Sequence, residues 1–168
     1  KDLPCGIISY ALEQDADYTA ANIEFDETAH ASFDCMEKGT LLGHFSLSVP
    51  GIHNVSNALS AIALGRKLGL SLESIQKGLL HFGGTDRRFQ YKGKVGDVTV
   101  IDDYAHHPTE IAATLRTAKN YPHKTIWCVF QPHTYTRTKA LMDEFAQALS
   151  LADKVVLADI YAARETDT

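Results

Sequence analysis

Paired cysteines and clustered basic residues are the first things that this sequence lacks. The 168-residue chain has three widely spaced cysteines, Cys5, Cys35 and Cys128, and no CxxC pair. It therefore indicates neither a disulfide framework nor a zinc knuckle, and it favours a reducing cytoplasmic setting. With 16 basic against 21 acidic residues, a net charge of −5 and no long basic run, the chain does not have the electrostatic footprint of a nucleic-acid-binding protein.

A membrane span and a leader are not indicated either. The longest stretch without a charged residue, 39–65, is interrupted by Pro50, Gly51 and several His and Asn residues, which argues against a membrane span. The opening KDLPCGIISY has no long apolar core and does not begin with Met. We therefore expect an excised piece of a longer protein. Its 45% apolar and 22% charged content is typical of a soluble globular protein with a hydrophobic core.

The first half of the chain changes from a strand pattern to a helix pattern. Alternating β-branched and aromatic residues predict strands at 7–12, 18–25, 31–37 and 41–50. Helical spacing begins at Asn54 and ends near Gly69, a plausible C-cap. Ser71 can cap a second helix, whose predicted apolar face consists of Leu72, Ile75, Leu79 and Phe82. The segment FGGTDRR follows, and its Gly-Gly pair predicts a domain boundary near 83–86.

The second half alternates strands and helices. We expect a hairpin that turns at Gly93 or Gly96 and continues into a strand at 98–101, then a helix whose first turn contains Pro108. A strand at 124–130, a helix around Phe145 and a strand at 154–159 follow. This order predicts parallel pairing with right-handed crossovers, and so an α/β fold.

Three polar segments follow the three predicted parallel strands. DDYAHHP comes after Ile101, QPHTYTR after Phe130 and DIYAARE after Ala158. Ligands of open parallel α/β sheets bind beyond the carboxyl ends of the strands, so His106, His133 and Arg137 are expected to converge there. Each segment taken alone could equally be a helix-capping loop.

A metal site is an alternative reading of the same edge. Hard and borderline ligands suited to zinc or manganese are present at Asp102, Asp103, His106, His107 and His133. No HExxH or HxH spacing occurs, and a nearby arginine would compete with a divalent ion. No dedicated metal site is therefore predicted, although a metal-dependent hydrolase stays open as an alternative function.

Three side chains can be interpreted either as ligand contacts or as structural residues. Arg137 offers a planar fork that matches a carboxylate, although it could be a solvated helix residue. Asp103, just past a strand, could accept a ribose hydroxyl or cap the next helix. Asn57, one turn into a helix, could present its amide to the edge of an adenine ring or act in capping.

Four segments in this order and spacing resemble the Mur ligases of peptidoglycan synthesis: GIHNVSNALSAIALG, FGGTDRRFQ, DDYAHHPTEI and VFQPHTYTRT. The resemblance runs over nearly the whole chain and is weakest in the first forty residues. GxHNxxN alone is shared with folylpolyglutamate synthases, whereas DDYAHHP together with QPHTYTRT is more specific. The segment QPHTYTRT favours a member that adds L-alanine, and a murein-tripeptide recycling ligase is the near alternative.

The resemblance implies a cytoplasmic, ATP-dependent ligase of cell wall biogenesis, with Mg²⁺ and with UDP-N-acetylmuramate and L-alanine as substrates. It implies an acyl phosphate that the L-alanine amine attacks. The residues that match adenine, phosphate and ribose contacts are His53, Asn54, Asn57, Arg87, Arg88 and Asp103. Those that match an L-alanine pocket are Tyr104, His106, His133 and Arg137, with His106 and Arg137 as the catalytic pair. Some relatives have Arg where this chain has Thr134, which implies a lighter carboxylate clamp here.

The resemblance also implies that the chain is about a third of such an enzyme. Residues 1–82 would be the end of a truncated central ATP-binding domain, with strands and two helices. Residues 86–168 would be the start of a truncated Rossmann-like parallel α/β domain. The phosphate loop GxxGK[ST], the UDP-sugar domain and the magnesium ligands of the central domain are missing. We therefore expect no turnover by this chain alone, and an exposed sheet edge that invites self-association.

Overall fold

The structure is a computed structural model that describes residues 5–166. The chain divides into two compact units, residues 1–84 and 85–168. The ends of the two predicted domains, residues 1–4 and 167–168, lie outside the described residues. Among the described residues, no helix combines the length and the apolar character that crossing a membrane requires.

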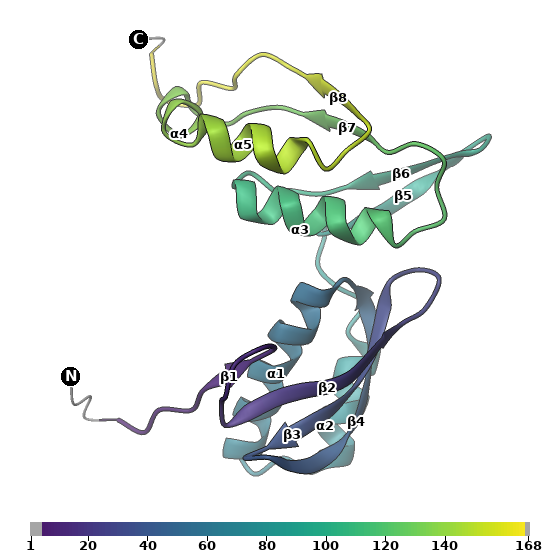
Figure 1. Cartoon of the computed structure of the whole chain (residues 1–168), viewed down its shortest axis with the longest axis vertical. Coiled ribbons are helices and arrows are strands. Elements are labelled where there is room, and N and C mark those ends of the chain that lie inside the picture. Colours follow the sequence, from purple (N-terminus) through teal and green to yellow (C-terminus); the bar gives the residue numbers. More distant parts are fainter. Residues whose placement is uncertain (1–4, 167–168) are drawn as a thin grey trace. The chain divides into compact units, whose positions relative to one another are not determined.

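The first unit is a four-stranded sheet followed by two helices (Figure 1). Its strands lie in chain order: β1 (Tyr10–Ala11), β2 (Tyr18–Phe25), β3 (His30–Glu37) and β4 (Thr40–Pro50). The β1–β2 pair is parallel, and the other two pairs are antiparallel. The helices are α1 (Ile52–Lys67) and α2 (Leu72–His81).

The predicted strand at 7–12 is only two residues long in the structure. Before β1, the Ser9 N–H and hydroxyl both donate to Asp17 Oδ2, at 2.9 and 2.8 Å. This local pair takes the Ser9 N–H away from a sheet ladder, and Ile7 remains 69% exposed. The remaining three predicted strands lie within one residue of the observed bounds.

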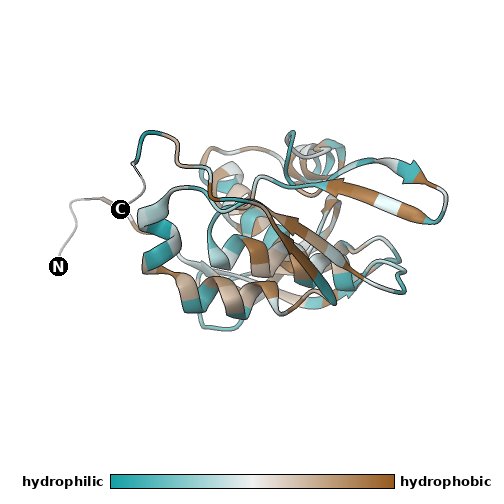
Figure 2. Cartoon of the chain, turned by 90° about the horizontal axis from the view of Figure 1, so that it is seen from above, coloured by the Kyte–Doolittle hydropathy of each residue, from teal (hydrophilic) through white to brown (hydrophobic). Residues whose placement is uncertain are grey.

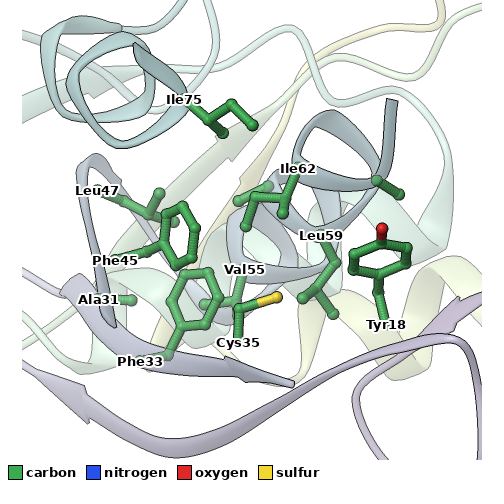
Figure 3. Packing of buried hydrophobic residues seen from close by; sticks show 12 residues of the cluster. Tyr18, Ala31, Phe33, Cys35, Phe45, Leu47, Val55, Leu59, Ile62 and Ile75 are labelled. Carbon is green, nitrogen blue, oxygen red and sulfur yellow. The ribbon is translucent and has the colours of Figure 1, made fainter. Parts of the chain in front are cut away.

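The core of the first unit lies between the sheet and α1 (Figure 3). Alternate residues of β3 and β4 point to this side, and the rings of Phe33 and Phe45 stack with centroids 5.8 Å apart. From α1, the helical spacing predicted from the sequence brings Val55, Leu59 and Ile62 against them, all fully buried. Burial of such side chains contributes about 1.5–3 kcal/mol each.

The helix ends of the first unit only partly follow prediction. Ser71 caps α2 as predicted, and its hydroxyl accepts from Ser74 N at 3.2 Å. Gly69 follows the C-cap of α1 with φ 76°, the left-handed conformation that glycine adopts at little cost. Phe82, however, is not on the apolar face of α2, because the helix ends at His81 and extended backbone leaves Phe82 half exposed.

The second unit begins with a hairpin of β5 (Gln90–Val95) and β6 (Val98–Asp102). Of the two turn positions predicted, Gly96 is the correct one: its φ of 59° suits a two-residue turn between Val95 and Val98. Gly93 instead lies where the register shifts. The remaining elements are α3 (Pro108–Lys119), β7 (Trp127–Phe130), α4 (Tyr135–Ala140), α5 (Met142–Leu149) and β8 (Lys154–Leu157).

Helices α3 and α5 pack together over β7 and form the core of the second unit. Ile111 and Leu115 of α3 belong to the same buried cluster as Phe130 and Phe145, whose ring centroids are 5.6 Å apart. The hydropathy colouring of Figure 2 shows apolar residues concentrated on strands and on parts of the helices, with polar residues in many of the loops. Strands β7 and β8 are parallel, as predicted, and the α/β class is confirmed.

The predicted continuous pairing of all three strands is wrong in one respect. Within residues 5–166, β6 pairs only with β5, and β7 only with β8. A groove of about 1070 Å³ is lined by both β6 and β7, and by α3. Val98, Trp127 and Val129 line it and are 64%, 64% and 76% exposed. Within the described residues, each of these two apolar strands therefore has one edge without a strand partner.

Candidate functional site

An open cavity of about 490 Å³ lies in the second unit, where the three polar segments meet. Six of the residues predicted from the sequence as ligand contacts line this cavity: Arg87, Asp103, Tyr104, His106, His133 and Arg137. The convergence expected from the sheet-edge argument is therefore present. The roles of these residues as ligand contacts stay predictions.

Asp103 accepts three hydrogen bonds that fix the conformation of the segment after β6. Its Oδ2 accepts from Phe89 N at 2.8 Å and from the Thr114 hydroxyl at 3.0 Å, and its Oδ1 accepts from Ala105 N at 2.8 Å. These bonds attach the linker and α3 to the end of β6. A carboxylate offers about four lone-pair sites, so Asp103 keeps capacity for one further donor. The reading of Asp103 as a helix N-cap is wrong, because His107 has that position.

Tyr104 and His106 form the wall that the first segment contributes. Their rings meet edge to face with centroids 5.4 Å apart. His106 Nδ1 lies 3.0 Å from the Tyr104 carbonyl oxygen, which can only accept, so Nδ1 has the proton. In the neutral ring Nε2 is then an acceptor. His106 thus brings a proton-accepting nitrogen to the cavity.

His107, which the sequence leaves without a role, is the N-cap of α3. Its Nδ1 accepts from Thr109 N at 3.3 Å, and Glu110 completes a capping box. Glu110 Oε2 accepts from the N–H groups of His106 and His107 at 3.0 and 3.2 Å. Partial burial raises the pKa of Glu110, but the His106 N–H, the Arg88 guanidinium and the positive charges of both outweigh it and hold this pKa below its usual value.

The two linker arginines have different surroundings. The Arg87 guanidinium lies over the Tyr104 ring, 4.6 Å from its centroid, and its Nε is 3.8 Å from Asp102 Oδ2. Arg87 has φ 60°, an uncommon backbone conformation for a residue other than glycine. Arg88 does not line the cavity in the part of the chain that the structure describes; its Nη1 lies 3.2 Å from Glu110 Oε1.

The second segment places His133 and Arg137 on one side of the sheet edge. Thr134 has φ 69° and turns the chain sharply into α4. The buried Thr138 hydroxyl donates to the Thr134 carbonyl at 2.7 Å and fixes this turn. The Arg137 guanidinium is partly buried and, within residues 5–166, forms no salt bridge. It therefore keeps its donors available for an anionic ligand.

The third segment fixes the second by backbone pairing. Thr134 N donates to Tyr161 O and Tyr161 N donates to Pro132 O, each at 2.9 Å. Glu165 then accepts from the Thr136 hydroxyl and from Thr136 N, at 3.0 Å for the N–H. These donors hold the pKa of Glu165 below its usual value. The turn that presents Arg137 is thus tied to residues 161–165.

Sequence reasoning missed two polar residues of the cavity wall, Gln131 and Tyr161, and considered a third, Asp102, only as a metal ligand. The Tyr161 ring lies 5.4 Å from the His133 ring, centroid to centroid. A signal was present, because DIYAARE is one of the three polar segments after a strand. The pattern could not say which of its side chains faces the cavity.

In the first unit, His53, Asn54 and Asn57 lie on the first turns of α1. Asn54 is not the cap of this helix: Gly51 is, and the Asn54 amide donates to the Pro50 carbonyl at 2.8 Å. Asn57 Nδ2 donates to Asn54 Oδ1 at 3.0 Å. The exposed Asn57 amide keeps its oxygen and one N–H for a ligand. His53 is half buried beside them.

The metal reading gains no support from this geometry. Among the described residues, no group of three or more His, Cys, Asp or Glu is arranged to hold a metal ion. The candidate ligands are used in other ways: Asp103 accepts from Phe89, Ala105 and Thr114, and His107 caps α3. The described residues thus do not fit a divalent cation site.

Residues 87–167 match the family model of the Mur ligase, glutamate ligase domain. The chain belongs to the Mur ligase family. It is 61% identical over 166 residues to a UDP-N-acetylmuramate–L-alanine ligase of Agathobacter rectalis, a match that covers 99% of this chain and 36% of that protein. The chain therefore spans about a third of the length of the curated relatives that it matches.

Solved structures agree with this assignment. The structure of a UDP-N-acetylmuramate–alanine ligase from Thermotoga maritima matches with a TM-score of 0.79 and 35% identity, over 93% of this chain and 35% of that one. A murein peptide ligase from Psychrobacter arcticus matches with a TM-score of 0.60 and 31% identity, over 88% and 31%. The fold match is thus better to the first of these two.

Proposed function

We propose that this chain is part of an ATP-dependent ligase that joins L-alanine to UDP-N-acetylmuramate in peptidoglycan synthesis, with the second unit holding L-alanine. The observation that carries the proposal is the cavity in which Arg137, without an acidic partner among residues 5–166, lies with His133 and His106. Such a group of donors suits a small carboxylate. The identity of 61% to a relative of this name supports the choice of substrates.

In this proposal the second segment binds the carboxylate of L-alanine. The Arg137 fork donates two parallel hydrogen bonds to the two oxygens, and His133 donates a third when its ring nitrogen is protonated. The Tyr161 ring and the hydrogen bonds that Thr136 donates to Glu165 hold these groups in place. A fixed carboxylate leaves the amine of L-alanine directed at the reacting carbonyl.

His106 has the proton-transfer role. L-alanine arrives as an ammonium ion, and one of its protons passes to His106 Nε2, the acceptor nitrogen of the ring. The free amine then attacks the acyl phosphate of the muramic acid carboxylate. A C–N bond forms, the C–O bond to phosphate breaks, and inorganic phosphate leaves with both electrons of that bond and takes up the proton that the new amide nitrogen loses.

The nucleotide contacts are proposed for each unit by itself. Asn57 and its partner Asn54, with His53, offer donor and acceptor groups suited to the edge of adenine. Asp103 keeps one acceptor site for a ribose hydroxyl, and Arg87 and Arg88 offer positive charge to phosphates. Mg²⁺, which neutralises nucleotide phosphates, is proposed to be held largely by residues outside this chain; among the described residues no three His, Cys, Asp or Glu side chains are arranged around one metal ion.

The domain assignment is part of the same proposal. Residues 1–82 are proposed to end an ATP-binding central domain, and residues 86–168 to begin the amino-acid domain. The chain alone is proposed to be inactive, because it has no Gly-Lys-Ser or Gly-Lys-Thr for a phosphate loop. A cytoplasmic location follows from the proposed substrates, since ATP and UDP-sugars are made there.

The murein-tripeptide ligase is the second candidate, because it shares the fold at 31% identity. A metal-dependent hydrolase is not favoured, since the named relatives are ligases. The deciding experiment measures phosphate release by the full-length protein with ATP and Mg²⁺. The acceptor is either UDP-N-acetylmuramate or the same lactyl sugar without UDP. We expect phosphate release with L-alanine and UDP-N-acetylmuramate. Release only with a murein tripeptide and the free sugar would assign the recycling reaction instead, and release without ATP would contradict both.

A further inference from the structure

Glu110 connects two groups to which the proposed function gives different ligands. Its Oε2 accepts from His106 N at 3.0 Å and lies 3.5 Å from His106 Nδ1, whereas its Oε1 is 3.2 Å from Arg88 Nη1. His106 lines the amino-acid cavity, and Arg88 belongs to the linker that is proposed to contact nucleotide phosphate. The Glu110 carboxylate thus contacts both a proposed phosphate-binding residue, Arg88, and a proposed amino-acid-binding residue, His106.

A capping role explains only part of this geometry. A capping box requires the Glu110 side chain to accept the backbone N–H of the N-cap, which it does at 3.2 Å from His107. It does not require a charged partner 22 residues earlier in the chain, nor a bond to the backbone of His106. The neutral side chain of Gln could form the cap equally well. The negative charge serves Arg88 and the His106 ring.

We propose that Glu110 is a positioning residue that couples nucleotide binding to amino-acid binding. With Arg88 in place, Glu110 divides its charge between the guanidinium and His106. A nucleotide phosphate that draws Arg88 away leaves Glu110 bonded to the N–H groups of His106 and His107, and the His106 segment is then held more firmly against the cavity. Nucleotide binding therefore tightens amino-acid binding, and by linkage the reverse holds too. This inference rests on the proposed function.

The size of the effect follows from the exposure of the partners. The side chains of Glu110 and Arg88 are 33% and 51% exposed, so solvent screens their interaction. We therefore expect a coupling of about 3- to 10-fold in affinity, around the lower limit of the roughly 5- to 150-fold range common for allosteric pairs. Another titratable group close to Glu110 is the His106 ring, whose Nδ1 lies 3.5 Å from Glu110 Oε2.

The test uses the full-length enzyme and Glu110→Gln, which keeps an oxygen for the cap but loses the charge. The dissociation constant of L-alanine is measured by calorimetry with and without a non-hydrolysable ATP analogue and Mg²⁺. We expect the analogue to tighten L-alanine binding in the wild type, and this gain to fall to less than 2-fold in Glu110→Gln. Glu73→Gln is the matched control, because Glu73 is also in the first turn of a helix and pairs with Lys77 at an exposed site.

The outcomes separate the coupling from the proposed function. Wild-type binding of both ligands with the same gain in Glu110→Gln would overturn the coupling and leave Glu110 as a cap. An Arg88→Gln variant must lose the same gain, and the double variant must lose no more than either single one; additive losses would also contradict the proposal. If the wild type bound neither L-alanine nor the ATP analogue, the proposed function would fail and this inference with it.

Discussion

Substitution of Arg137 by Ala in the full-length enzyme tests the amino-acid site most directly. The guanidinium lines the cavity, is partly buried and has no salt bridge within residues 5–166, so no internal partner compensates its loss. A hydrogen bond to a charged group contributes about 1.5–3 kcal/mol. Since about 1.4 kcal/mol is a factor of ten, the KM for L-alanine should rise by roughly 10- to 150-fold.

The assay is ATP-dependent phosphate release with L-alanine and ATP varied in turn. We expect the KM for ATP to change by less than about 3-fold, because Arg137 makes no proposed contact with the nucleotide. Arg137→Lys keeps the charge without the planar fork and should recover only part of the affinity. Arg116→Ala, an exposed position in the last turn of α3, is the control. Equal increases in both KM values, or no increase for L-alanine, would refute the carboxylate role.

Two further predictions concern the chain itself. Leu59→Ala in the fully buried core of the first unit should lower its free energy of unfolding by about 2–5 kcal/mol, measured by urea denaturation; Leu64→Ala on the same helix, 59% exposed, is the control, and equal losses would contradict the packing described. The 168-residue chain should self-associate through the unpaired edges of β6 and β7, and Val129→Lys in the groove should shift it toward monomer in sedimentation velocity. A monomeric wild type at high micromolar concentration would refute the edge argument.

Local patterns predicted those features that depend on neighbouring residues. The apolar positions of α1 and the Ser71 cap of α2 involve residues three or four apart, so their spacing is visible in any short window. The same holds for Pro108 in the first turn of α3. The errors arose where a competing local bond was overlooked: Ser9 bonds to Asp17 and shortens β1. The start expected for α1, Asn54, is also two residues late, since the helix begins at Ile52 after the N-cap Gly51.

The candidate site could be predicted only as a set of segments. That polar side chains after Ile101, Phe130 and Ala158 meet follows from parallel strand order and from the edge at which such strands end. Which side chains line the cavity does not follow, since the segments contain capping and bonding residues of the same chemical types. His107 turned to the helix cap, whereas its neighbour His106 turned to the cavity.

The sequence by itself determined the two kinds of unit, the order of their strands and helices, and the family, because these are written in residue spacing and in motifs. Only the tertiary structure decided how the polar groups divide their bonds. Hydrogen bonds join Asp103 to Phe89, Arg88 to Glu110 and Thr136 to Glu165, pairs that are 14, 22 and 29 residues apart in the sequence. Such pairs form only when packing brings distant segments together, so no local pattern contains them. The same packing leaves Arg137 without a partner among the described residues and thus available to a ligand.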